Sequence, residues 1–467
     1  MSIDPPLFSR RLFLTRGVQL LSAAGTLPLF LDRSARCLAA DHAANPQGAG
    51  RPDQRVLVVV QLAGGNDGLN TIVPITNDDY YRACRTLGVA KKSALRLTDD
   101  FGLHPSARGF KKLWDDGHMA VLHAVGYPNP NRSHFRSTDI WSSGDAEAIG
   151  RTGWLGRYFD ACCNGEDPGA QAKGTAKKAT DPAAAIALQG EPPMALVGKD
   201  YLPIVFRSPD DLAHAESSRD ERLKSAFEKL NDVDPDEMMD APPGKIHIPR
   251  GTKGSARPAP PQQPQPDDAS DFLRRSALNA RVYADTIRKT VSAVQNKASY
   301  PASAFASQLK LTAQMIAAGL PTRVYYVQLG GFDTHSGQAP RHVRLLEELS
   351  GGLAAFVEDL KALGHLDRTT VMTFSEFGRR VAENGSAGTD HGEAAPMFVF
   401  GSSIQPGFHG APPELSSAKL NRGDVRWSLD FRRVYATVLS QWLKADDVKV
   451  LGKRFEPVGL FARAALD

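Results

Sequence analysis

The chain has 467 residues, its formal net charge is +4, and 42% of its residues are hydrophobic. This apolar fraction excludes wholesale disorder, and four cysteines are too few for a scaffold built from disulfides. So small a charge excess does not indicate a nucleic-acid-binding protein, and we expect no nucleic acid among the partners.

Residues 1–44 have the features of a signal peptide. Arg10 and Arg11 form a twin-arginine pair, residues 17–31 carry no charge, and small residues gather within 39–44. This order favours the twin-arginine translocase, whereas a plain Sec signal or an N-terminal anchor helix is the alternative. Fifteen uncharged residues are too few to span a bilayer comfortably. We therefore expect a periplasmic or secreted protein with no stable membrane span after cleavage.

Short apolar runs rich in β-branched residues alternate with helical patterns along the rest of the chain. The runs have the length of buried strands, and the alternation predicts an α/β fold with a mostly parallel central sheet flanked by helices. Apolar residues spaced three and four apart predict helices over 308–319 and from Val343 to near Gly364. The predicted strands are Arg55–Leu62, Met119–Val125, Ala184–Leu188, Val324–Leu329, Val371–Phe374 and Met397–Phe400.

Two stretches have the composition of insertions. Residues 164–182 are rich in Gly, Ala, Lys and Asp without periodicity, and residues 234–270 are rich in proline. Neither composition can bury a core, so we expect disordered, mobile surface loops. With these set aside, residues 45–467 are predicted to form a single α/β domain.

Acidic and histidine residues follow the predicted strands. Because ligands bind beyond the carboxyl ends of strands in open α/β sheets, we expect these side chains to meet. Carboxylate and imidazole together suit one or two divalent ions, Zn²⁺, Mn²⁺, Mg²⁺ or Ca²⁺. Taken singly, an aspartate after a glycine turn is more often a helix cap or a turn residue than a ligand. The candidate ligands are Asp67, Asp333, His335, Asp390, His391 and His409, and the candidate rim residues are Asn66, Glu376 and Arg379.

A nucleophile candidate lies after the predicted strand Met119–Val125. A helix is expected to start near Ser133, where its hydroxyl would meet unsatisfied N–H groups and the positive end of the helix dipole. The competing interpretation is a simple helix cap. His134, Arg132 or Arg136 would orient the anion, Arg by bidentate contacts.

With these residues in view, the chain resembles family 1501 of the domains of unknown function, whose members are exported by the twin-arginine route. The matching blocks span about residues 55–160 and 300–440. That family is similar to the alkaline phosphatase and sulfatase superfamily, and the resemblance implies an alkaline-phosphatase-like sheet between helices and a two-metal site. The blocks are Val58–Pro74, Leu103–Pro105, Gly117–Phe135, Gly153–Arg157, Gly330–His335 and Thr373–Pro396.

The resemblance also implies roles for single residues. Asp67 matches the first metal-binding aspartate of the superfamily, and Ser133 lies where its nucleophile is expected. Asp390 and His391 match its Asp-His pair and complete one metal site with Asp67 and Ser133. The second metal would be held by Asp333, His335 and His409. Only Thr334 separates Asp333 from His335, where superfamily members often have three residues, so the second metal is held differently or the site has one metal.

The leading hypothesis is an exported, metal-dependent hydrolase of phosphate or sulfate esters in which Ser133 attacks a small anionic ester. The first rival is a non-catalytic exported protein that keeps the fold to bind an envelope polymer or a partner. The second is a metal-free serine esterase with Asn66 as oxyanion donor. Metal content and resistance to chelators separate the three.

Overall fold

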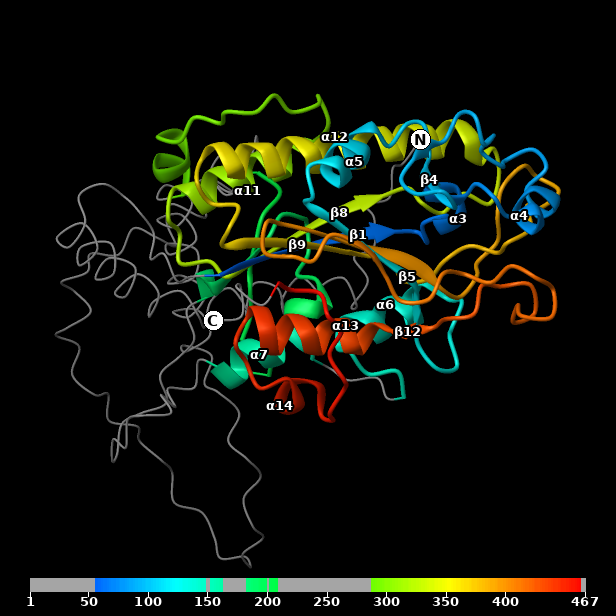
Figure 1. The fold of residues 1–467 in the computed structure, drawn as a ribbon. Coiled ribbons are helices and arrows are strands. Elements are labelled where there is room, and N and C mark those ends of the chain that lie inside the picture. The colour runs from blue at the N-terminus through cyan, green and yellow to red at the C-terminus, as the bar shows by residue number, and fades with distance from the viewer. Residues whose placement is uncertain (1–54, 148–151, 163–181, 200, 209–286, 463–467) are drawn as a thin grey trace, which may run out of the picture. The chain divides into compact units, whose positions relative to one another are not determined.

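The computed structural model describes residues 55–147, 152–162, 182–199, 201–208 and 287–462 (Figure 1). The chain divides into two compact units, and all of the described residues belong to the unit formed by 35–208 and 287–467. The predicted signal peptide lies outside the described residues. So do the predicted insertion 234–270 and, apart from its last residue, the predicted insertion 164–182.

The centre of the described unit is a nine-stranded sheet with the order β11-β5-β10-β9-β1-β8-β6-β7, in which β12 also pairs with β5. Strands β9, β1, β8, β6 and β7 run parallel, and β10 runs antiparallel to both of its neighbours. The mostly parallel sheet predicted from the sequence is thus confirmed. The strands are β1 (Val56–Ala63), β5 (Met119–Gly126), β6 (Ala185–Ala187), β7 (Ile204–Val205), β8 (Val324–Gly330), β9 (Thr369–Phe374), β10 (Ala395–Phe400), β11 (Gly407–His409) and β12 (Leu429–Asp430).

Strand β1 shows why apolar runs on both faces become central strands. It pairs with β8 on one side and β9 on the other, and Val58 lies in register between Tyr325 and Val371. All three of these side chains are buried, as a strand covered on both faces requires. The β-branched composition of Val56–Ala63 therefore serves a position with no solvent-facing side.

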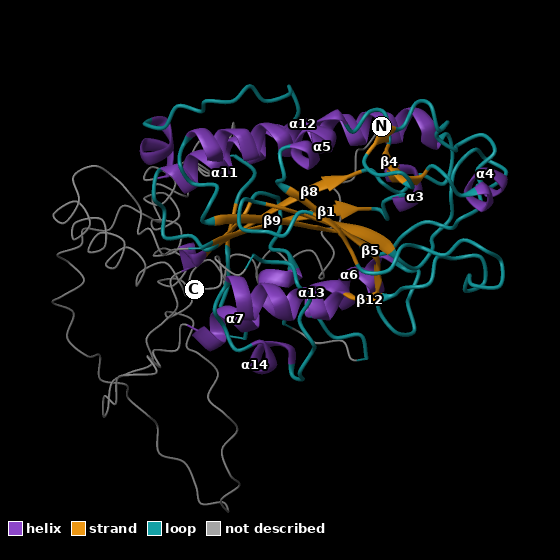
Figure 2. Ribbon diagram, in the orientation of Figure 1, coloured by secondary structure: helices purple, strands orange, loops and turns teal. Residues whose placement is uncertain are grey.

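Helices cover both faces of the sheet (Figures 1 and 2). Helices α5, α11 and α12 pack together on one face, and α6, α7, α13 and α14 lie on the other. The predicted helices 308–319 and 343–364 are confirmed as α11 and α12, both starting a few residues earlier than predicted. Helix bounds are α3 (Gly68–Thr71), α4 (Asp78–Ala83), α5 (Arg108–Asp115), α6 (His134–Ser143), α7 (Trp154–Cys162), α11 (Ala304–Ala317), α12 (Gln338–Ala362), α13 (Phe431–Thr437) and α14 (Asp447–Leu451).

Smaller elements complete the described unit. Three single-turn segments are η1 (Pro182–Ala184), η2 (Met194–Leu196) and the π-helical η3 (Val438–Trp442). A second, three-stranded antiparallel sheet consists of β2 (Ile72–Pro74), β3 (Leu95–Arg96) and β4 (Phe101–Leu103). None of the helices in the described ranges is both long enough and apolar enough to cross a membrane.

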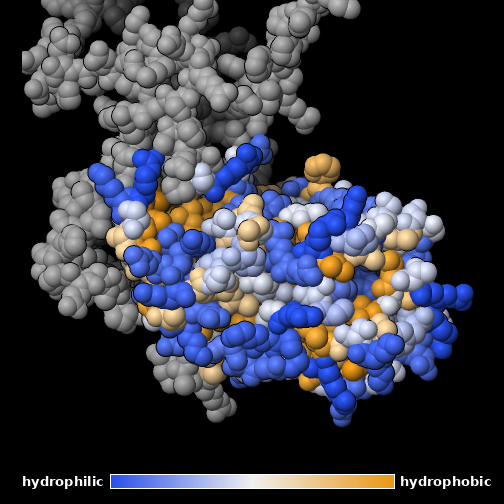
Figure 3. Space-filling model, turned by 90° about the horizontal axis from the view of Figure 1, so that it is seen from above, coloured by the Kyte–Doolittle hydropathy of each residue, from blue (hydrophilic) through white to orange (hydrophobic). Residues whose placement is uncertain are grey.

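Stacked aromatic rings pack one of the two helical layers together. Under α6 and α13 the core is aromatic, since Trp141 stacks on Phe431 with ring centroids 4.3 Å apart and Trp154 stacks on Tyr435 at 4.1 Å. The opposite layer shows solvent a mainly hydrophilic face with smaller hydrophobic spots (Figure 3). Stacked aromatic rings of this size fix α6, whose first turn carries candidate site residues.

The strand directions bring five loops to one edge of the sheet. Strands β1, β5, β8 and β9 are parallel and end there, whereas the antiparallel β10 begins there. The segments after β1, β5, β8 and β9 and the segment before β10 therefore meet at this edge. Every predicted site residue except His409 lies on one of these five segments.

Candidate metal centre

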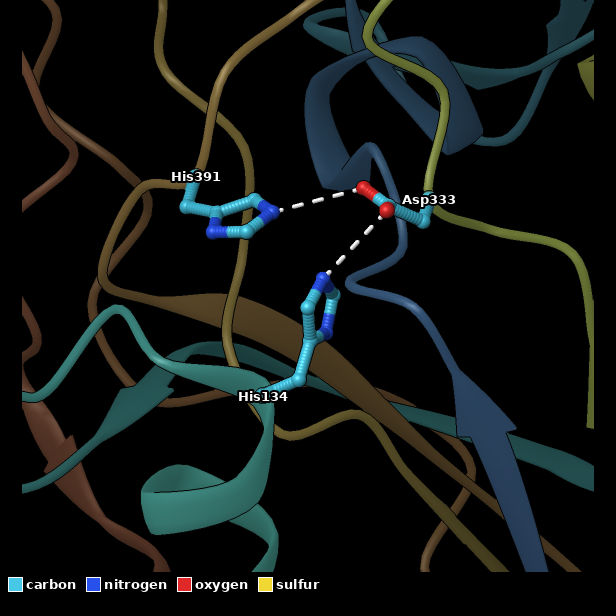
Figure 4. Close-up of side chains that lie close together, drawn as sticks. All are labelled: His134, Asp333 and His391. Carbon is cyan, nitrogen blue, oxygen red and sulfur yellow. Dashed lines mark hydrogen bonds and ion pairs between the residues drawn. The ribbon is translucent and has the colours of Figure 1, made fainter.

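Four residues from three of these segments form what we call the His/Asp cluster: His134, Asp333, His335 and His391. His134 opens α6, Asp333 and His335 follow β8, and His391 precedes β10. The carboxylate of Asp333 lies between two imidazoles, with Oδ2 at 3.4 Å from His134 Nε2 and Oδ1 at 3.3 Å from His391 Nε2 (Figure 4). Its Oδ1 is also 3.2 Å from His335 Nε2.

A buried carboxylate fixes the orientation of His134. His134 Nδ1 lies 2.8 Å from Glu376 Oε1, which also accepts a hydrogen bond of 2.8 Å from the backbone N–H of Gly64. Because a carboxylate only accepts, Nδ1 carries the proton and the lone pair sits on Nε2. That nitrogen is buried without a hydrogen-bond partner among the described residues and points toward Asp333 (Figure 4).

A backbone carbonyl does the same for His391. Its Nδ1 donates to the carbonyl oxygen of Arg132 at 2.7 Å, so its Nε2 also carries a lone pair. In His335, Nδ1 donates to Asp390 Oδ1 at 3.0 Å, and its Nε2 lies 2.9 Å from His391 Nε2. The two Nε2 atoms thus face each other beside the Asp333 carboxylate, so a proton or a metal ion has to lie between them.

Asp333 is held in its ionised form. Its Oδ1 accepts from Arg379 Nη2 at 2.7 Å. Burial alone would raise the pKa of Asp333, but the hydrogen bond from Arg379, the contact with His391 and the neighbouring positive charge lower it to about 2. The carboxylate is therefore available as a ligand at neutral pH.

Arg379, predicted to lie at the rim, is a buried cross-link beneath the cluster. Its guanidinium donates to the carbonyls of Gly64, Gly65, Phe332 and Thr389 as well as to Asp333. One side chain thus ties together the loops after β1 and β8 and the loop before β10. All three of its nitrogens donate to these acceptors, so the sequence run Phe377-Gly378-Arg379 positions the cluster rather than meeting solvent.

The donor set fits a divalent ion. One ligand atom from each of His134, Asp333 and His391 lies within 4.8 Å of the others, and His335 stands beside them. Neutral imidazole and carboxylate suit zinc or manganese, and each imidazole has an outer partner that fixes its tautomer. Burial, followed by the nearby charge of Arg379, lowers the pKa of His391 and keeps its ring neutral.

Asp390 supports the cluster from its edge. Its Oδ1 accepts from Asn384 Nδ2 at 3.0 Å and from His335 Nδ1 at 3.0 Å. These two hydrogen bonds lower the pKa of the Asp390 carboxyl. Of the predicted Asp390-His391 pair, His391 faces the other ligand atoms, and Asp390 orients His335.

Ser133 lies at the N-cap of α6, directly before His134. It is exposed, its backbone N–H donates to Asn131 Oδ1 at 2.8 Å, and its side chain makes no capping hydrogen bond. The hydroxyl is therefore not committed to the helix end, in contrast to a simple cap. Of the predicted anion-binding arginines, Arg132 forms an ion pair with the buried Asp424, and Arg136 Nη1 is buried without a hydrogen-bond partner among the described residues.

The structure places Asp67 and Asn66 away from the cluster, in the buried turn after β1. Asp67 caps α3 and accepts hydrogen bonds from the Asn70 backbone at 3.1 Å, from Asn70 Nδ2 at 2.7 Å and from Gln338 Nε2. Asn66 is fully buried, its N–H donates to Ser375 Oγ, and its Oδ1 accepts from Thr71. The oxygens of Asp67 already have three protein donors.

His409 also lies apart from the cluster. It is on the edge strand β11, in register with Leu122 and thus four residues before the end of β5. Its Nε2 lies 2.8 Å from the carbonyl of Gln405. Of the six predicted ligands, Asp333, His335, Asp390 and His391 therefore lie together. Asp67 is a buried carboxylate outside this group, and His409 is on an edge strand.

Sequence reasoning assigned His134 to anion orientation and missed the parts played by Asn384 and Gln338. The signal for His134 was present, since it directly follows the predicted turn at the end of β5. No sequence signal marks Asn384 or Gln338, because an amide side chain on a loop or in a first helical turn is typical of many surfaces.

A family profile matches part of the chain, and several solved structures are distantly similar to it. The sequence profile of the family described as "Protein of unknown function (DUF1501)" matches residues 266–450. The match bears out the predicted resemblance over these residues, and the blocks Gly330–His335 and Thr373–Pro396 lie inside the matched range. No curated protein matches the chain.

Two solved structures show distant similarity to the chain. A sulfatase from Pseudoalteromonas sp. has 11% identity and a TM-score of 0.31, with 94% of this chain and 72% of that chain covered. The lipoteichoic acid synthase LtaP from Listeria monocytogenes has 9% identity and a TM-score of 0.27, with 88% and 80% covered. These scores are too low to carry an argument about function, which rests on the site instead.

Proposed function

We propose that this chain, which matches the DUF1501 family over residues 266–450, is an exported hydrolase of phosphate or sulfate esters. A divalent ion would be held by His134, Asp333 and His391, with His335 beside it. The sulfate or phosphate class follows from the anion-binding features at the start of α6, and export follows from the N-terminal twin arginines.

One observation carries the metal assignment: three imidazoles direct their Nε2 atoms toward one carboxylate. Glu376, Asp390 and the Arg132 carbonyl each accept the Nδ1 proton of one ring. The 2.9 Å between the Nε2 atoms of His335 and His391 is favourable only when a proton or a metal ion lies between them. Histidines with this outer support are typical of metal ligands.

Bound there, a divalent ion would lower the pKa of a nearby hydroxyl and offset the charge that develops on the ester oxygens. Ser133 Oγ would attack the phosphorus or sulfur atom, giving up its proton as the bond to the leaving oxygen breaks and that oxygen takes a proton. Water would then hydrolyse the serine ester and release phosphate or sulfate. The N–H groups of the first turn of α6, which have no partner within the helix, would hold the anion.

Metal content and turnover test this proposal together. The mature protein, supplied with Zn²⁺ or Mn²⁺, is expected to hydrolyse 4-nitrophenyl phosphate or 4-nitrophenyl sulfate and to lose that activity to a chelator. Ser133→Ala should abolish turnover and keep the metal, whereas Ser299→Ala, at an exposed serine of another segment, should match the native protein. Full activity in Ser133→Ala contradicts the nucleophile.

The two rival functions are outcomes of the same experiment. A stoichiometric metal with no turnover on any ester would favour a non-catalytic binding protein. Activity that survives a strong chelator would favour a serine esterase. The geometry offers the esterase little support, because Asn66, its oxyanion donor, is fully buried.

A further inference from the structure

A polar cavity of about 690 Å³ lies next to the His/Asp cluster, and the proposed function does not involve it. Its lining includes Arg132, Arg422, Arg426, Glu393 and Trp427. Arg132 also holds the Nδ1 proton of His391 through its carbonyl, 2.7 Å away. The cavity and the cluster therefore adjoin at Arg132.

The lining carries surplus positive charge. Arg132 is paired with Asp424, which is buried and also accepts from Arg380. Neither Arg422 nor Arg426 has an ion-pair partner for its side chain within the ranges that the structure describes. Glu393 is the single carboxylate of the lining, and its Oε1 accepts from Asn421. The cavity therefore attracts anions.

A tight turn holds Arg422 at the cavity. The backbones of Asn421 and Asp424 exchange two hydrogen bonds of 3.0 Å, and the two residues between them have positive φ angles, 55° at Arg422 and 91° at Gly423. This is the two-residue hairpin turn in which both central residues are left-handed. A left-handed conformation is unfavourable for arginine, and such conformations gather at ligand sites.

Trp427 gives the cavity an aromatic wall. The end of β5 packs against it so closely that a Cβ on Gly126 would lie 2.7 Å from the Trp427 Cβ. Glycine at position 126 therefore lets the tryptophan approach the strand. A half-buried indole beside guanidinium groups is suited to a ring that bears an acidic substituent.

We infer that this cavity is a specificity subsite for a second anionic group of the substrate, carried on a ring that packs against Trp427. The inference rests on the proposed function, because the ester itself would lie at the His/Asp cluster. Guanidinium groups bind carboxylate, sulfate and phosphate oxygens in a bidentate manner, so Arg422 and Arg426 would select substrates with a second acid.

Direct binding tests the subsite without any turnover. The probe is 4-sulfobenzoate, a ring with two acidic groups and no ester, titrated calorimetrically into the native protein. Arg422→Ala and Arg426→Ala should each weaken binding about tenfold, the loss expected of one charge-assisted hydrogen bond. Arg454→Ala, which removes an exposed arginine on another segment, should bind as the native protein does. Benzoate should bind the native protein more weakly.

The results separate the subsite from the proposed function. Binding of 4-sulfobenzoate that depends on Arg422 and Arg426 supports the subsite even if no ester is hydrolysed, an outcome that would contradict only the proposed function. No binding by the native protein, or an equal loss in Arg454→Ala, overturns the subsite. In an active enzyme, the subsite also predicts a lower KM for 4-carboxyphenyl phosphate than for phenyl phosphate, a difference that Arg426→Ala removes.

Discussion

Two groups of polar residues at the same edge of the sheet use carboxylates in opposite ways. In the buried group, Asp67 meets three donors from Asn70 and Gln338, so its charge is fully hydrogen-bonded by the protein. In the His/Asp cluster, Asp333 accepts one hydrogen bond from Arg379 and otherwise faces the Nε2 atoms of imidazoles whose Nδ1 atoms have other partners. The first group is complete as it stands, and the second has the donor arrangement of a site for a cation. Residue type alone does not separate a structural carboxylate from a metal ligand, whereas the donors around it do.

Removing the Asp333 carboxylate should have the largest effect. Asp333→Asn takes away the negative charge between His134 and His391, so the protein should lose its metal and, with it, all hydrolysis. Adding Zn²⁺ should raise the thermal midpoint of the native protein and leave that of Asp333→Asn unchanged. An equal rise in both would mean that the ion binds elsewhere.

The outer support of His134 should have a smaller effect. Glu376→Gln keeps the size of the side chain but removes the charge that holds the Nδ1 proton, so the metal dissociation constant should rise about 10- to 100-fold. Competition with a chelator measures that constant. Glu456→Gln, at an exposed glutamate away from the cluster, is the matched control. An unchanged metal affinity in Glu376→Gln would show that Glu376 does not orient His134 for the metal.

The buried group should respond in stability instead of in metal content. Asp67→Asn places an amide group beside the amide donors of Asn70 and Gln338. The free energy of unfolding, measured with urea, should therefore fall by about 1–3 kcal/mol. Asp78→Asn, at an exposed position, should change the free energy of unfolding by less than about 0.5 kcal/mol. If Asp67→Asn were instead as stable as the native protein and metal-free, the contrast between the two groups would fail.

The smallest effect concerns a histidine with no ligand role. Burial lowers the pKa of His123, which lies between Phe101 and Phe408, from its ordinary 6.5 to about 4. Between these pH values the unfolded chain binds a proton that the folded chain does not. Stability should therefore fall as the pH drops from 6.5 to 4, by at most about 1.4 kcal/mol per pH unit from this residue.

His123→Phe tests this dependence. Urea unfolding at pH 7 and pH 5 should show a smaller loss of stability in the variant than in the native protein. Some loss should remain, because burial also lowers the pKa of His104 to about 4. Identical losses in the two proteins would show that His123 does not contribute.

The fold was accessible from the sequence because its signals are local. Runs such as Val56–Ala63 are apolar on both faces, and α12 keeps its apolar spacing over 25 residues. The pairing of β10 was not accessible, since an apolar run has the same composition whichever way it runs. The meeting of loops at one edge followed from strand direction. It brings Asp333 and His335 into contact with Asp390 and His391, which the resemblance had assigned to a different metal.

The remainder of the site depends on contacts between distant segments. Asp67 is held by Gln338, 271 residues away in the sequence, and Asp333 is held by Arg379, 46 residues away. These distant contacts make Asp67 a structural carboxylate and place Asp333 in the cluster. His409 follows a predicted strand as the other candidates do, but β11 pairs beside the middle of β5, and its register cannot be inferred from three residues. The imidazole tautomers depend likewise on Glu376 and on a backbone carbonyl.

The central claim is tested most directly by metal content per chain, measured by mass spectrometry on three proteins purified in parallel. These are the native protein, Asp333→Asn and Asp67→Asn. The account predicts a bound divalent ion in the native protein and in folded Asp67→Asn, and none in Asp333→Asn. A native protein that stays metal-free after incubation with Zn²⁺ and Mn²⁺, or an ion lost from Asp67→Asn and kept by Asp333→Asn, would contradict it.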